Sequence, residues 1–80
     1  MGYHLTDIPK GVLGEFSKIK EEFLELEDAV KQNDSILVLN ELSDMVGAIE
    51  EYVKRWNLDL NALKTFSDKT KSAFIDGKRK

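Results

Sequence analysis

Two pairs of acidic residues have a spacing that could hold a metal ion. The stretch "EEFLE" contains Glu22 and Glu25, and the stretch "ELSD" contains Glu41 and Asp44, so each pair is three positions apart. On an α-helix, residues at this spacing lie on the same side, about 60° apart around the axis. Mg²⁺ takes carboxylate oxygens as ligands and keeps several waters that a substrate phosphate can displace. The pairs therefore predict a metal site if the fold brings them together.

The pattern of apolar residues predicts helices that carry both pairs. Apolar side chains recur at steps of three and four in residues 16–30 and again in residues 38–56. This spacing is typical of amphipathic helices. We expect the first helix to begin at Pro9 or Gly11 and to end at Lys31, so that it includes the first acidic pair.

Two further helices complete the expected fold. The second is predicted over residues 35–56, with Asp34 or Ser35 as its N-cap. A third, less regular helix is expected after Asp59, with Gly77 as its stop. Short loops make consecutive helices antiparallel neighbours. The sequence thus predicts an all-α fold, an antiparallel helical bundle of three main helices.

The length of 80 residues predicts one domain, residues 1–80, with a flexible start over residues 1–8 and a loose tail over residues 77–80. A chain this short buries only about 60% of its unfolded surface. We therefore expect a homo-dimer or homo-tetramer, in which the first two helices of each chain complete a four-helix core.

Composition excludes several classes of function. The chain has no cysteine, so thiol nucleophiles, disulfides and zinc–thiolate sites are excluded. Its net charge of −3 is not that of a nucleic-acid-binding protein, and no nucleic acid is expected as a partner. No apolar run approaches the roughly 20 residues of a membrane span. We expect a cytoplasmic protein that does not bind membranes.

The two acidic pairs have matching positions on their helices. Around the axis of the first helix, Glu25 lies about 60° to one side of Glu22, and the stripe of apolar residues within residues 16–30 is centred about 80° to the other side. On the second helix, Asp44 and the apolar stripe have nearly the same offsets from Glu41. If the stripes pack together, the acids meet at one rim, where a divalent cation would relieve their repulsion. The alternative is that acids on a highly charged chain face water. That alternative applies most directly to the remaining acids, Glu21, Glu27, Asp28, Glu50 and Glu51.

The pattern Glu21-Glu22-x-x-Glu25, followed by Glu41-x-x-Asp44, resembles the MazG-like members of the all-α nucleoside triphosphate pyrophosphohydrolase superfamily. The opening "DIPKGVLGEFSKI" and the close "SDKTKSAFIDGKR" look like those of small phage and bacterial MazG-like proteins. The resemblance covers most of the chain, from residue 7 to residue 79.

The resemblance implies hydrolysis of a nucleoside triphosphate between its α and β phosphates, with Mg²⁺ as cofactor and Mn²⁺ as an alternative. It assigns the metal to Glu22, Glu25, Glu41 and Asp44, and it makes Glu21 a further ligand, a second-metal contact or the group that orients the attacking water. The last helix of the family commonly brings an Asn and a Lys to the phosphates. Ser67 occupies the Asn position here, and the candidate phosphate contacts are Lys69, Lys71 and Arg79.

Two other functions remain open. The helices could form a non-catalytic oligomerisation or protein-binding module, or the same metal site could act on a pyrimidine deoxynucleotide, a signalling nucleotide or a phosphoribosyl nucleotide. Among the other residues, His4 is expected on the surface. Phe16, Tyr52 and Trp56 are expected in the core or in a subunit interface.

Overall fold

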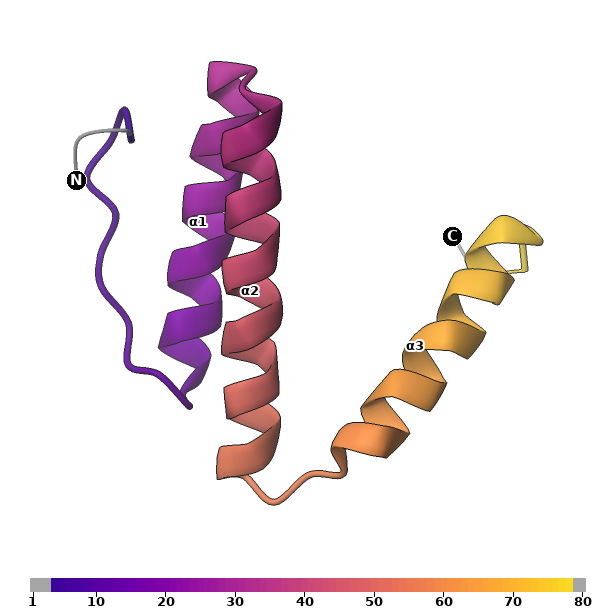
Figure 1. Ribbon diagram of the computed structural model, residues 1–80. Helices are drawn as coiled ribbons and strands as arrows, with labels where there is room; N and C mark the ends of the chain where they lie inside the picture. Colours follow the sequence, from indigo (N-terminus) through magenta and orange to yellow (C-terminus); the bar gives the residue numbers. More distant parts are fainter. Residues whose placement is uncertain (1–3, 79–80) are drawn as a thin grey trace.

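The computed structural model describes residues 4–78, which form three helices and no strand. An extended N-terminal segment leads into α1 (Phe16–Gln32), which is followed by α2 (Ser35–Arg55) and α3 (Leu60–Ile75). α1 and α2 lie side by side and run in opposite directions, while α3 extends away from them (Figure 1). The predicted all-α class with three main helices is confirmed.

The first helix begins later than predicted. Gly14 has a φ of 90°, a left-handed conformation that interrupts a helix, and the N–H of Glu15 closes a turn on the carbonyl of Val12 at 2.9 Å. Regular helix therefore begins at Phe16, and the predicted start at Pro9 or Gly11 is wrong. The residues before this turn form the extended segment instead.

A two-residue link turns the chain from α1 into α2. Asn33 has a φ of 59° and donates its N–H to the carbonyl of Val30, which ends α1. Asp34 then accepts hydrogen bonds from the N–H groups of Ile36 and Leu37, each at 3.1 Å. Because the end of one helix and the cap of the next are adjacent, the hairpin has little freedom in its register.

The other helix ends agree closely with the predictions. α2 ends at Arg55, and Asn57 follows with a φ of 57°. Asp59 caps α3, and its carboxylate accepts hydrogen bonds from two N–H groups in the first turn of that helix. Gly77 has a φ of 77° just beyond the end of α3, as expected of a C-terminal stop.

α3 does not lie along the hairpin. It contacts α2 and makes no contact with α1, and none of its residues is buried. Large apolar side chains on this helix are exposed, including Phe66 and Ile75, with exposed fractions of 64% and 84%. No helix within residues 4–78 combines the length and apolar character that a membrane crossing requires.

The hairpin buries a different face of α1 from the one predicted. Its buried residues are Glu21, Glu22, Asp28 and Ala29, and α2 contributes Glu41, Ala48 and Val53. The centre of this α1 face lies about 140° around the helix from the apolar stripe. Several residues predicted for the core or an interface are therefore exposed, namely Phe16, Phe23, Val30, Leu42 and Trp56. The acids lie within the face that α1 buries and not at the edge of the apolar stripe.

Candidate metal centre

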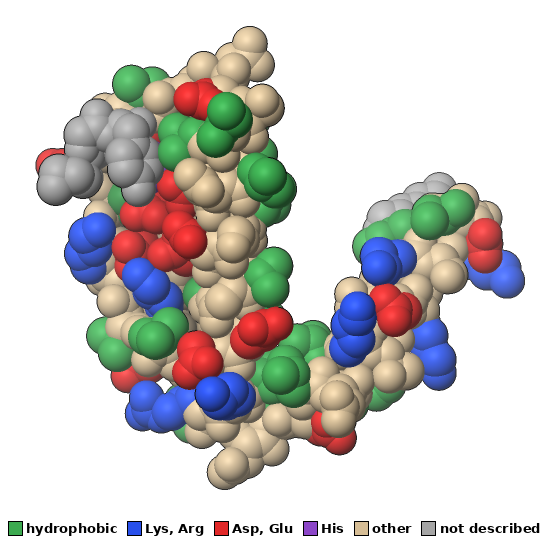
Figure 2. Space-filling view, in the orientation of Figure 1, with side chains coloured by type: hydrophobic (Ala, Val, Ile, Leu, Met, Phe, Trp, Pro, Cys, Tyr) green, Lys and Arg blue, Asp and Glu red, His purple; other side chains and the backbone are tan. Residues whose placement is uncertain are grey.

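The hairpin brings the four predicted ligands together. Glu22 and Glu25 come from α1 and Glu41 and Asp44 from α2, and one carboxylate oxygen of each lies within 4.8 Å of the others. We call these four residues the acidic cluster. Figure 2 shows acidic side chains gathered on one face of the hairpin. The antiparallel course of α1 and α2 explains this meeting, since it places the middle of one helix beside the middle of the next.

The buried oxygens of the acidic cluster fit a hard divalent cation. Glu22 and Glu41 are 4% and 1% exposed, and Oε1 of each is buried without a hydrogen-bond partner among the described residues. Buried acceptors are normally satisfied, because leaving one unpaired costs free energy. Ligands that are all carboxylate oxygens suit Mg²⁺. The geometry and the donor type therefore both agree with the predicted ligand set.

Burial raises the pKa of Glu22, Glu25 and Glu41. Neighbouring carboxylates raise these pKa values further, as the charge of Asp44 does for Glu41 and the charge of Glu41 does for Glu25. Lys18 acts in the opposite direction on Glu22, and His4 on Glu41. The metal-free cluster is therefore an unfavourable place for four negative charges.

Glu21 has different partners. Its Oε1 accepts hydrogen bonds from the N–H of Gly11 at 2.8 Å and from Nζ of Lys18 at 3.0 Å, and Nζ of Lys10 lies 3.6 Å from its Oε2. Burial by itself acts to raise the pKa of Glu21, but these donors outweigh it and the pKa is lowered. A Cβ on Gly11 would clash with the carbonyl oxygen of Ser17, so only glycine fits there. Glu21 thus anchors the N-terminal segment and lies outside the acidic cluster.

Lys18 is a residue that the sequence predictions missed. Its Nζ lies 3.1 Å from Oε2 of Glu22 as well as 3.0 Å from Oε1 of Glu21. Its spacing of four residues from Glu22 was the available signal, because such pairs face each other on a helix. Beside it lies a groove of about 450 Å³ whose lining includes Glu22, Ser43 and Asp44. The acidic cluster is therefore open on one side to a groove that Lys18 also lines.

His4 is the second missed residue, and its predicted surface position is wrong. Its side chain is 5% exposed, with Nδ1 2.8 Å from Oδ2 of Asp28 and Nε2 3.3 Å from Oε2 of Glu41. The same Asp28 oxygen accepts the N–H of Leu5 at 2.7 Å. The extended segment follows α1 (Figure 1), which brings these groups together. His4 and Leu5 thus both contact Asp28, and the flexible start over residues 1–8 stays a prediction.

Asp28 is also buried, although it was expected to face water. Its exposed fraction is 5%. Burial by itself acts to raise the pKa of Asp28, but the hydrogen bonds from the Leu5 N–H and from His4 outweigh it and the pKa is lowered. The charged form of Asp28 is therefore well matched to its surroundings, unlike the carboxylates of the acidic cluster.

The predicted phosphate contacts are not beside the acidic cluster within one chain. Lys69 and Lys71 lie on α3, which makes no contact with α1. Both are exposed, and Nζ of Lys71 lies 3.3 Å from Oδ1 of Asp68. The basic side chains of α3 are separate from the acidic face of the hairpin in Figure 2. Arg79 lies outside the described residues.

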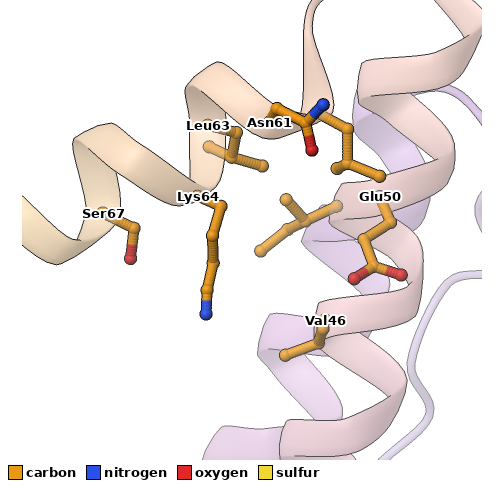
Figure 3. Close-up of a pocket in the computed structure, with 8 residues that line it drawn as sticks. Val46, Glu50, Asn61, Leu63, Lys64 and Ser67 are labelled. Carbon is orange, nitrogen blue, oxygen red and sulfur yellow. The ribbon is translucent and has the colours of Figure 1, made fainter.

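A second hollow lies between α2 and α3 and is separate from the acidic cluster (Figure 3). It has a volume of about 460 Å³, and Leu60, Leu63 and Val46 give it apolar walls. Its polar groups include Glu50 from α2 and Lys64 from α3. None of the four clustered acids lines it, so this hollow is not part of the candidate metal centre.

Comparison of the chain with protein-family models, with curated proteins and with solved structures found no match in any of the three. The MazG-like resemblance therefore stays a prediction from the sequence.

Proposed function

We propose that the chain is a Mg²⁺-dependent nucleoside triphosphate pyrophosphohydrolase, which releases a nucleoside monophosphate and pyrophosphate. The supporting observation is the acidic cluster, with its two buried carboxylate oxygens that accept no hydrogen bond from the described residues. Bound Mg²⁺, or Mn²⁺ in its place, supplies neutralisation of the phosphate charge and lowers the pKa of a coordinated water.

The side chains have separate roles in this proposal. Glu22, Glu25, Glu41 and Asp44 hold the cation, and Asp44, which is exposed and lines the groove, faces the substrate. Lys18 lines the same groove and offers a positive charge to a phosphate there. Lys69, Lys71 and Arg79 remain candidate phosphate contacts. Glu21, with its charged form stabilised by Gly11 and Lys18, keeps the entry to α1 in place.

The proposal includes assembly as a homo-dimer or homo-tetramer. The chain exposes 6243 Å², whereas a folded monomer of 9.1 kDa exposes about 4,900 Å². Its radius of gyration is 14.4 Å, against about 11.6 Å for a compact chain of this length. A partner that covers the apolar stripe of α1 would bury part of this surface.

A nucleotide screen with pyrophosphate release as its readout tests the proposed reaction. The purified chain is assayed with Mg²⁺ or Mn²⁺ against common ribo- and deoxyribonucleoside triphosphates, including the pyrimidine deoxynucleotides. Glu22→Gln, Glu25→Gln, Glu41→Gln and Asp44→Asn should each lower kcat/KM by roughly 100-fold or more. Glu27→Gln is the matched control, because Glu27 is an exposed acid on α1 outside the cluster. Absence of pyrophosphate release from every substrate would refute the reaction.

A non-catalytic helical module is the second candidate. The observation that favours it is the exposure of apolar side chains on α3, such as Phe66, Phe74 and Ile75. In that case the four substitutions would stabilise the metal-free fold, by relieving repulsion, and would leave the function in cells intact. Pyrophosphate release that depends on the acidic cluster would exclude this candidate.

A further inference from the structure

His4 reaches the edge of the acidic cluster. One of its ring nitrogens, one oxygen of Glu25 and one oxygen of Glu41 lie within 4.8 Å of one another. The distance from Nε2 of His4 to Oε2 of Glu41 is 3.3 Å. Two neighbouring ligands of an octahedral ion at about 2.1 Å lie about 3.0 Å apart. The imidazole and the Glu41 carboxylate are therefore close to the separation that a shared ion requires.

Asp28 holds the imidazole in a suitable orientation. Its Oδ2 lies 2.8 Å from Nδ1 of His4, so Nδ1–H donates to the carboxylate and Nε2 faces Glu41. A carboxylate that accepts a hydrogen bond from one ring nitrogen, and so directs the other toward the metal, is a common partner of metal-binding histidines. The arrangement is buried, since the side chains of His4 and Asp28 are each 5% exposed and that of Glu41 is 1% exposed.

A separate observation indicates that a ligand belongs at this place. Oε1 of Glu41 is buried and has no hydrogen-bond partner among the described residues, although Oε2 of the same carboxylate lies near His4. A cation bound by His4 and by this oxygen of Glu41 would remove the cost of an unpaired buried acceptor.

We propose that His4 is a metal ligand, which forms a mixed nitrogen and oxygen site with Glu25 and Glu41. Imidazole nitrogen binds first-row transition dications better than it binds Mg²⁺, which prefers oxygen ligands. The site therefore prefers a transition dication such as Mn²⁺ to Mg²⁺. This inference rests on the proposed function only in placing a cation at the acidic cluster.

Pulsed electron paramagnetic resonance of the full chain loaded with Mn²⁺ tests the inference. Nitrogen bound directly to Mn²⁺ modulates the electron spin echo, and the chain has a single histidine, so this signal can be assigned to His4 if the purification tag contains none. The wild-type protein should show the modulation, and His4→Gln should abolish it. The Kd for Mn²⁺ should rise roughly 10- to 100-fold in His4→Gln and also in Asp28→Asn, which disturbs the orientation of the ring.

Mg²⁺ affinity and a neighbouring variant supply the controls. The Kd for Mg²⁺ should change less than about 3-fold in His4→Gln, because the oxygen ligands remain. Leu5→Ala should bind Mn²⁺ as the wild type does, since Leu5 is 70% exposed and its backbone N–H still donates to Asp28. Far-ultraviolet circular dichroism of the metal-free variants checks that each one folds.

The outcomes separate this inference from the proposed reaction. Wild-type protein that binds Mn²⁺ without nitrogen modulation overturns the inference, and this result needs no variant to fold. Equal losses of Mn²⁺ and Mg²⁺ affinity in His4→Gln also overturn it, because His4 would then only position Glu41. Nitrogen modulation in a protein that releases no pyrophosphate supports the inference and refutes the reaction. Pyrophosphate release without nitrogen modulation supports the proposed reaction and overturns the inference that His4 binds the metal.

Discussion

At the scale of single residues, Glu21 and Glu22 show that hydrogen-bond donors decide the direction in which the pKa of a buried acid shifts. The two side chains are neighbours in sequence and are 3% and 4% exposed. The pKa of Glu21 is lowered, because the Gly11 N–H and Lys18 outweigh the effect of burial. The pKa of Glu22 is raised, because burial and Glu25 outweigh Lys18. A cation at the acidic cluster would stabilise the charged form of Glu22, as the hydrogen-bond donors stabilise the charged form of Glu21.

The metal-free protein should therefore become less stable as the pH rises above about 5. Burial raises the folded-state pKa of Glu22, Glu25 and Glu41 above the usual value of 4.5, so their neutral forms favour the folded chain. That contribution is complete below about 4.5 and is lost as the pH rises through the raised values. Urea denaturation in EDTA across this range should show a falling free energy of unfolding.

Two further observations test this assignment. Lys18 and His4 face the cluster and favour its charged forms, so they reduce the size of the fall. Added Mg²⁺ should raise the free energy of unfolding most at about pH 7.5, where the carboxylates are charged. A metal-free stability that is constant or rising over this range would contradict the buried, unneutralised state of the cluster.

Glu41→Gln should stabilise the metal-free protein at neutral pH. The amide keeps the shape of the side chain and an oxygen for His4, but it removes a buried charge that Asp44 and Glu22 oppose. We expect an increase in the free energy of unfolding on the order of 1 kcal/mol. The increase should disappear when Mg²⁺ is present, since the wild type then gains the stability of binding. Destabilisation without metal would show that the Glu41 charge is already compensated.

At the scale of elements, the short link between α1 and α2 sets the register that assembles the cluster. Asn33 closes α1 in a left-handed conformation, and Asp34 caps α2 directly after it. This local geometry places the first acidic pair opposite the second. α3 depends on its own cap, Asp59, and on limited contact with α2. Asp34 therefore caps a helix that carries half of the acidic cluster, whereas Asp59 caps a helix that carries none of it.

Asp34→Ala and Asp59→Ala should have different consequences. Loss of an N-cap typically costs about 1 kcal/mol. In Asp34→Ala the loss should lower the global free energy of unfolding and weaken Mg²⁺ binding, because α2 carries half of the cluster. In Asp59→Ala it should increase hydrogen exchange in α3 and leave Mg²⁺ affinity unchanged. Amide hydrogen exchange with metal titration distinguishes the two, and equal global effects would mean that α3 is an integral part of the hairpin.

At the scale of the whole molecule, the single chain leaves apolar residues exposed on several sides. Phe16, Phe23 and Val30 belong to the apolar stripe of α1, and they are 66%, 51% and 58% exposed. Exposed apolar area of this extent marks an interaction surface in small proteins. The acids and the N-terminal segment cover the opposite side of α1, so the stripe is available to a partner while the acidic cluster stays within one chain.

Phe23→Glu should break the proposed assembly. A charge in the middle of the apolar stripe would have to be buried in the interface, which is unfavourable. The wild type should elute as a dimer or larger species in size-exclusion chromatography with light scattering, and the variant should shift to the monomer. Lys31→Gln, an exposed substitution about 100° around α1 from the centre of the stripe, is the control. A monomeric wild type at concentrations of about 100 μM would contradict the assembly.

The sequence by itself determined the helices, their caps and the meeting of the acids. These features depend on neighbours along the chain: steps of three and four, the capping by Asp34 and Asp59, and a link too short to change the order of α1 and α2. The tertiary structure alone decided which face of α1 is buried, and it joined His4 to Asp28 across 24 positions. Periodicity marks an apolar face but does not say what will cover it. The face of α1 that is buried depends on the groups that fold against it. Here one of those groups is the extended N-terminal segment, whose His4 contacts Asp28 although the two are far apart in sequence.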